Sequence, residues 1–264
     1  MARIFAIMSG KGGVGKSTIS AALAECYARQ DKRVTLVDGD IGLRCADLML
    51  NLQNQVIYDL GDLMEKECSL DKALVHPMHL PNLSLLAAPQ MMRPSDVKSK
   101  DLGKIIARLA DRQDIVILDA PAGIGRGLKN LLGAQAESMI VATPDDVSIR
   151  DAERLGMLLS EKGEMHPGLI LNRVRKKLIK TGEMVAPQAL AESLDMPLMG
   201  VIPESEKIYR ALLRHESALH CEDKAVLQAV ENLAARLLGE DAPMPDYRPS
   251  PVWRFFNRGG ESLS

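Results

Sequence analysis

The residues from Gly10 to Thr18 read G-K-G-G-V-G-K-S-T and are the part of the chain best suited to chemistry. They match the phosphate-binding pattern G-x-x-x-x-G-K-[ST], in which Lys16 reaches the β- and γ-phosphates and the Ser17 hydroxyl ligates Mg²⁺. The glycines permit positive-φ turns and a close approach of the backbone to the phosphates. A second lysine, Lys11, follows the first glycine, so the loop carries two cations. The predicted nucleotide contacts are Gly10, Lys11, Gly12, Gly13, Val14, Gly15, Lys16, Ser17 and Thr18.

Three carboxylates follow two other apolar runs. Asp38 and Asp40 end the run V-T-L-V-D-G-D, and Asp119 ends the run I-V-I-L-D. A carboxylate at the carboxyl end of a buried strand, beside a phosphate loop, suits Mg²⁺ and its water ligands. Capping of a turn is the structural alternative for any single one of them. The sequence predicts Asp38 and Asp119 for the metal, and predicts that Asp40 positions or deprotonates a water that attacks the terminal phosphate.

The elements that must position these residues are those of an α/β protein. Ile4–Met8 precedes the loop as a short apolar strand, and Ser17–Arg29 follows it with helical spacing. A helix N-terminus directly after a glycine loop is an anion site. Short β-rich runs then alternate with helical patterns, which predicts a mostly parallel central sheet flanked by helices, the three-layer α/β fold of P-loop NTPases. The other predicted strands are Arg33–Val37, Leu83–Ala87, Ile115–Leu118, Ser138–Ala142, Gly168–Leu171 and Leu198–Val201, and the other predicted helices are Leu102–Ala110, Ser148–Ser160, Pro187–Leu194 and Lys224–Leu238.

Composition excludes several classes of protein. The chain has 264 residues, 46% of them hydrophobic, which is enough for one large α/β domain. Its net charge of −2 gives no electrostatic case for bulk nucleic-acid binding. None of the four cysteines forms a C-x-x-C pair, which predicts a reducing cytoplasm and neither a structural zinc site nor a disulfide framework. There is no signal-peptide pattern and no apolar run long enough to span a membrane.

The C-terminal part changes character after the predicted ATPase domain, residues 1–238. Residues 239–251 contain four prolines and are predicted to be an extended linker. Residues 252–264 form a short tail in which Val252, Trp253, Phe255 and Phe256 share one side of a helical wheel, with basic and polar residues opposite. Interfacial membrane helices have this pattern, and packing of the tail on its own domain is the alternative. One copy would bind a membrane marginally, whereas two copies held together would bind well.

Four runs of residues resemble the deviant-Walker ATPases of the MinD/ParA family: K-G-G-V-G-K-S-T, D-G-D-I-G-L-R, D-A-P-A-G-I-G and V-I-P-E. The resemblance extends nearly end to end and fits the septum-site branch of the family best. It implies that Lys11 is the signature lysine, which reaches across a dimer interface to the ATP of the other subunit. It also implies that Asp40 is the catalytic switch residue and that Asp119 serves the metal.

The resemblance further implies that Asn172, Pro203 and Glu204 contact the adenine, although their positions also fit a strand end and a helix start. Asp151 and Glu153, on the predicted helix Ser148–Ser160, are implied for partner binding. In the family, ATP and Mg²⁺ drive dimerisation and attachment to the cytoplasmic face of the plasma membrane. The dimer recruits an inhibitor of division, MinC, and hydrolysis stimulated by MinE releases it.

Two relatives within the family stay open as alternatives, a ParA-type partition ATPase that binds DNA and a flagellar-number regulator. The tail departs from the family pattern because it is rich in aromatic residues and less basic, which leaves its lipid preference open. The strongest basic run, Arg173–Lys180, could touch DNA or anionic lipid, but such a run is more often a solvated loop face.

Overall fold

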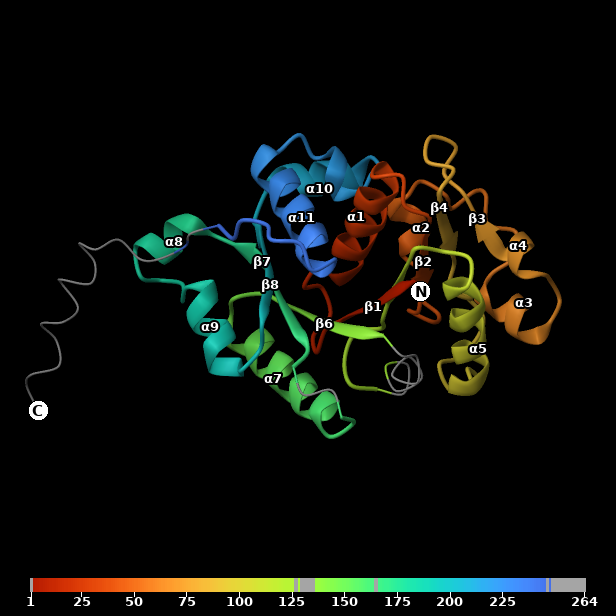
Figure 1. The fold of residues 1–264 in the computed structure, drawn as a ribbon, viewed down its shortest axis with the longest axis horizontal. Coiled ribbons are helices and arrows are strands. Elements are labelled where there is room, and N and C mark those ends of the chain that lie inside the picture. The colour runs from red at the N-terminus through yellow and green to blue at the C-terminus, as the bar shows by residue number, and fades with distance from the viewer. Residues whose placement is uncertain (1, 126–127, 129–135, 164–165, 246, 248–264) are drawn as a thin grey trace, which may run out of the picture.

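The computed structural model describes residues 2–125, 128, 136–163, 166–245 and 247. In this part of the chain a single eight-stranded sheet has the order β3-β4-β2-β5-β1-β6-β7-β8, and only the β3–β4 pair is antiparallel. Figure 1 shows the sheet edge-on between two layers of helices, which confirms the predicted fold class. The strands are β1 Arg3–Met8, β2 Val34–Asp38, β3 Leu74–Val75, β4 Leu83–Leu86, β5 Ile115–Asp119, β6 Glu137–Ala142, β7 Gly168–Val174 and β8 Leu198–Pro203.

Each face of the sheet carries its own hydrophobic core. One core lies under α1, α2, α10 and α11, and the other lies under α3, α4, α5, α7 and α9 (Figure 1). The described helices are α1 Lys16–Arg29, α2 Ala46–Met49, α3 Leu60–Glu65, α4 Leu70–Ala73, α5 Ser99–Ala110, α7 Asp146–Ser160, α8 Lys176–Lys180, α9 Pro187–Leu194, α10 Glu206–Leu213, the 3₁₀ turn η1 Ala218–His220 and α11 Lys224–Leu237.

The three central strands bring the chemistry to one edge of the sheet. β5 lies between β2 and β1, so that Asp38 is the register partner of Asp119 and Ile7 is its partner on the other side. Every residue of β2 and β5 is buried, and Thr35 is the one polar residue in them before the aspartates, as expected for strands covered on both faces. Because parallel strands end at the same edge, the loop after β1 and both aspartates meet there.

Short elements account for most differences from the sequence-based prediction. β3 has two residues and α3 has six, lengths at which periodicity carries little information. The start of α3 depends instead on a capping box, in which the Asp59 carboxylate accepts from the backbone N–H groups of Gly61 and Asp62. The basic run predicted as a loop face divides into the end of β7 and the helix α8.

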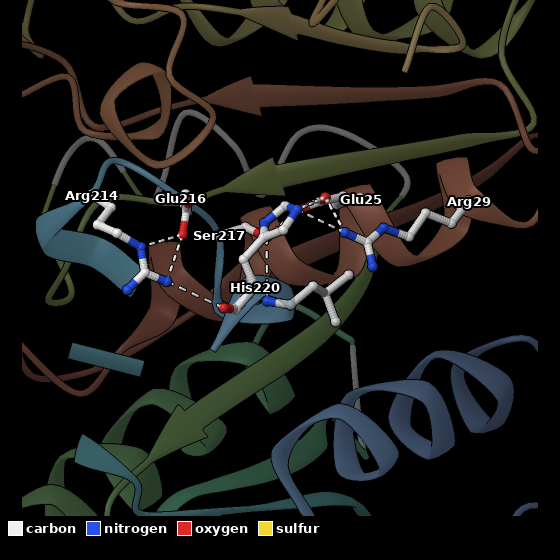
Figure 2. A network of polar contacts seen from close by, with 7 residues as sticks. Glu25, Arg29, Arg214, Glu216, Ser217 and His220 are labelled. Carbon is white, nitrogen blue, oxygen red and sulfur yellow. Dashed lines mark hydrogen bonds and ion pairs between the residues drawn. The ribbon is translucent and has the colours of Figure 1, made fainter. Parts of the chain in front are cut away.

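A polar network fixes the segment after α10 to the helix that follows the phosphate loop. Glu25 of α1 is 2% exposed, and its carboxylate accepts hydrogen bonds from the Ser217 hydroxyl and, at 2.7 Å, from Arg29. His220 Nε2 lies 3.4 Å from the same carboxylate, and Arg214 pairs with Glu216 nearby (Figure 2). A buried carboxylate needs such partners, and here they hold α1, α10 and η1 in one arrangement.

The predicted boundaries at residues 239 and 252 remain predictions. The tail residues Val252, Trp253, Phe255 and Phe256 lie outside the described residues. Among the described helices, none combines the length and the apolar character that a membrane span needs.

Candidate nucleotide-binding and catalytic site

The backbone of the phosphate loop has the shape that its glycines predict. Gly13 and Gly15 have φ angles of +79° and +94°, and Gly15 is the N-cap of α1. A Cβ at Gly15 would lie 2.2 Å from the Asn172 amide nitrogen, and one at Gly10 would lie 2.5 Å from the Asp151 carbonyl oxygen. Side chains at these two positions would therefore push the loop away from β7 and α7.

Lys16 and Asp119 form a buried ion pair at the base of the loop. Lys16 Nζ lies 2.9 Å from Asp119 Oδ1, and the two side chains are 6% and 1% exposed. Ser20, one turn further along α1, places its hydroxyl 2.9 Å from the same oxygen. Lys16 Nζ also donates to the Ser17 hydroxyl at 3.2 Å. A phosphate that enters the loop therefore meets a lysine already held by a carboxylate.

Asp38 and Asp40 lie in different environments although they are close in the chain. Asp38 is fully buried and accepts backbone N–H groups of Asp40, Cys45 and Ala46 at 2.9–3.0 Å. Burial and the neighbouring Asp119 carboxylate raise the pKa of Asp38 to about 6, and the backbone donors oppose this shift. Asp40 begins the following loop and is half-buried; burial raises its pKa, and the charge of Lys16 opposes the shift.

The residues at this edge fit Mg²⁺. Asp119 Oδ2 is buried and has no hydrogen-bond partner within the described part of the chain, so one acceptor stays available. In that part no group of three or more His, Cys, Asp and Glu side chains is arranged to hold a metal ion. Magnesium in nucleotide sites is held by one or two carboxylates together with phosphate oxygens and water, so a full protein cage is not needed. Ser17, Asp38 and Asp119, the predicted metal residues, are brought together by α1, β2 and β5.

Lys11 lies on the outer shoulder of the loop. Its ammonium group is 3.6 Å from Asp145 Oδ1, and the two side chains are 42% and 48% exposed. Asp145 is the N-cap of α7, where its carboxylate accepts the Ser148 N–H at 3.0 Å. An exposed pair at this distance stabilises a protein by less than about 1 kcal/mol, so Lys11 can exchange this partner for another anion.

A cavity of about 830 Å³ opens beside the loop and is large enough for a nucleoside. Gly15, Thr18, Asn172 and Glu204 line it, as does Tyr209 of α10. Asn172 is buried and donates a 2.7 Å hydrogen bond to the Val14 carbonyl oxygen, which supports the loop from below.

At the mouth of the cavity Glu204 pairs with Arg175, whose hydrogen bond holds the pKa of Glu204 below its ordinary value. Pro203 lines a neighbouring cavity of about 800 Å³ instead, and Glu204 stands between the two cavities. Of the three residues implied for the adenine, Asn172 therefore lines the first cavity, Pro203 lines the second, and Glu204 lines both.

The two residues implied for partner binding differ in accessibility. Glu153 is exposed on α7, whereas Asp151 is half-buried. The backbone carbonyl of Asp151 is the group that a Cβ at Gly10 would meet, so this turn of α7 packs against the phosphate loop. A partner that binds α7 would thus lie next to the loop that holds the phosphates.

Sequence reasoning missed three residues of the site: Ser20, Asp145 and Arg175. Ser20 lies four positions after Lys16, on the same side of α1, and this spacing was a usable signal. Asp145 precedes a helical pattern, as an N-cap does. Nothing local marks Arg175, because its partner Glu204 belongs to a different strand end.

Comparison with known proteins decides the family. Residues 5–218 match the CobQ/CobB/MinD/ParA nucleotide binding domain, which is more than half of the chain. The chain belongs to this family. It is 37% identical over 248 residues to the septum site-determining protein MinD of Synechocystis sp., and the match covers 94% of this chain and 93% of that protein.

Two solved structures have the same fold over nearly the whole chain. The MinC:MinD cell division protein complex of Aquifex aeolicus has a TM-score of 0.85 and 32% identity, with 94% of this chain and 100% of that chain covered. The septum site-determining protein MinD of Pyrococcus horikoshii, complexed with Mg-ADP, has a TM-score of 0.79 and 28% identity, covering 90% and 96%. The chain is therefore a P-loop ATPase of the cell-division branch, and its predicted cofactors ATP and Mg²⁺ are confirmed.

Proposed function

We propose that the chain is an ATP-driven switch that controls septum placement from the cytoplasmic face of the plasma membrane. ATP binding brings two copies together, and the dimer attaches through residues 252–264. Hydrolysis separates the copies and releases them. The observation that carries the proposal is the difference between the two lysines of the loop. Lys16 is buried in an ion pair with Asp119, whereas Lys11 is exposed and makes a weak, exposed ion pair with Asp145 at 3.6 Å.

Each charged residue has a distinct part in this proposal. Lys16 neutralises the β- and γ-phosphates after it exchanges Asp119 for them. Mg²⁺ would lie with Ser17 and Asp119 and offset charge on the phosphates, and Asp38 would accept hydrogen bonds from its water ligands. Asp40 would orient the attacking water, and Lys11 of the second copy would complete the neutralisation.

The partners in the proposal are proteins of the same pathway. A MinC-like inhibitor and a MinE-like activator would bind the surface of α7, where Glu153 is exposed and Asp151 packs against the loop. The solved complex named for MinC and MinD supports the first of these partners. An activator at α7 could reach the phosphates through the contact between Asp151 and Gly10.

Vesicle co-sedimentation tests the proposal. The full chain is mixed with vesicles that contain anionic lipid, with a non-hydrolysable ATP analogue, with ADP or without nucleotide, and DNA binding is measured in parallel. We expect pelleting with the analogue only, and its loss on deletion of residues 252–264. DNA binding that needs the analogue, without pelleting, would instead select the partition ATPase.

A further inference from the structure

Three lysines of α8 form a small surface of unpaired positive charge. Lys176, Lys177 and Lys180 are all exposed, and none has a carboxylate within ion-pair distance among the residues that the structure describes. The preceding Arg175, by contrast, is paired with Glu204. We call the three residues the α8 lysines. Like charges gathered on a helix of five residues repel one another, so an anionic partner would stabilise this surface.

The segment after α11 is fixed to that helix and approaches this surface. Asn232 and Arg236 of α11 donate hydrogen bonds to the carbonyl oxygens of Pro243 and Ala242, at 3.0 and 2.8 Å. Tyr247 is 7% exposed and lines a cavity of about 800 Å³ together with Lys176, Lys177 and Leu178. Figure 1 shows this segment crossing the end of the sheet from α11 to α8.

The position of Tyr247 limits where the tail can act. Val252 is five residues further along the chain. Five residues span at most about 17 Å when fully extended. A tail that inserts its aromatic side chains into a membrane would therefore hold α8 close to the lipid head groups.

We propose that the α8 lysines are a second membrane contact, specific for anionic lipid head groups. This inference rests on the proposed attachment through residues 252–264. The side chains of the tail carry a net charge of only +1, from Arg254, Arg258 and Glu261, whereas the α8 lysines carry +3. A lysine within a Debye length of an anionic membrane, about 8 Å at physiological salt, strengthens binding about fivefold. The tail supplies apolar burial and the α8 lysines supply the preference for negative charge.

DNA is the competing anion, and the charge distribution argues against it. Binding to DNA without sequence preference needs cations along an extended track. Here the three α8 lysines occupy one short helix of a chain with a net charge of −2. An anionic membrane, which the tail would bring close to α8, fits the small cluster of α8 lysines better than DNA does.

The test compares two triple variants of the full chain. The first replaces Lys176, Lys177 and Lys180 by Gln. The matched control replaces three other exposed lysines by Gln: Lys66 at the end of α3, Lys72 in α4 and Lys100 in α5. These helices lie at the other end of the sheet from α8 (Figure 1). Binding is measured with a non-hydrolysable ATP analogue on vesicles of phosphatidylcholine, with and without about 30% phosphatidylglycerol. Dimer formation and DNA binding are measured in the same buffers.

We expect the α8 variant to bind the anionic vesicles about 30- to 100-fold more weakly, with unchanged dimer formation and a smaller dependence on salt. The control should bind as the unaltered chain does. Unchanged binding of the α8 variant would overturn the inference, as would a loss of DNA binding with lipid binding intact. If deletion of residues 252–264 removes binding while the α8 variant binds normally, the proposed function stands and this inference fails. If that deletion leaves binding intact, the proposed attachment itself is wrong.

Discussion

The base and the shoulder of the phosphate loop present two lysines in opposite environments. At the base, Lys16 lies in a buried cluster with Ser20 and Asp119. At the shoulder, Lys11 is 42% exposed and its ammonium group lies 3.6 Å from Asp145 Oδ1. The buried pair is costly to break because each partner would leave an uncompensated charge, whereas the exposed pair is easily exchanged. One lysine is thus built into the folded monomer, and the other is available to a second molecule.

Replacement of Lys16 by Ala should have the largest effect. It removes the cation nearest the phosphates and leaves Asp119 buried without its partner. We expect ATP turnover to fall by about 10²–10³-fold, as for loss of one strong electrostatic contact to the transition state. The free energy of unfolding should fall by about 3–5 kcal/mol in urea titrations. A variant as stable as the unaltered chain would contradict the buried pairing.

Replacement of Lys11 by Ala should separate activity from stability. We expect the free energy of unfolding to change by less than about 1 kcal/mol, because the pair with Asp145 is exposed. The dimer formed with a non-hydrolysable ATP analogue should disappear in size-exclusion chromatography. Asp145→Asn is the matched control, since it removes the same pair but leaves Lys11 in place, and it should still dimerise. A dimer that survives loss of Lys11 would show that this lysine does not act across the interface.

The carboxylates at the base should make stability depend on pH. Because burial raises the pKa of Asp38 to about 6, the folded, metal-free chain binds more protons than the unfolded chain between about pH 4 and 6. Stability from this group therefore falls as the pH rises through that range, by about 2–3 kcal/mol. Carbon-13 NMR titration of the carboxyl groups checks this. Asp114, whose pKa is lowered to about 2 by its hydrogen bonds with Arg33, is the internal reference. A midpoint near 4 for Asp38 would mean that its burial is less complete.

Asn172 supports the loop between its two lysines, and its replacement by Ala should have the smallest effect on function. Loss of the hydrogen bond to the Val14 carbonyl oxygen should lower the free energy of unfolding by about 1–2 kcal/mol. The KM for ATP should rise about tenfold, because the loop loses its support and the cavity loses a polar group. Asn232→Ala is the control, since Asn232 is similarly buried and also donates to a carbonyl oxygen, that of Pro243. Equal KM values for the two variants would limit Asn172 to a structural role.

The sequence prediction and the observed sheet order agree on where the carboxylates lie. Apolar runs that end in Asp38 and Asp119 indicated strands whose carboxyl ends carry the chemistry, and the register of β2 and β5 places these two residues side by side. Short elements such as α3 and α8 were missed, because helices of six and five residues are too short to show a helical repeat in the sequence. The implied adenine residues were only partly brought together, since Pro203 faces a different cavity from Asn172.

The phosphate loop was determined by the sequence itself, because its requirements are local: glycines at positive φ, a helix that starts at once, and a lysine and serine at fixed spacing. The tertiary structure alone decided which lysine is buried, since the partner of Lys16 is 103 positions away and is brought there by the pairing of β1 with β5. It likewise decided that Tyr247 lines the same cavity as Lys176 and Lys177 of α8. Contacts between side chains that are far apart in the sequence depend on strand order and on how helices pack. The spacing of neighbouring residues predicts neither of these.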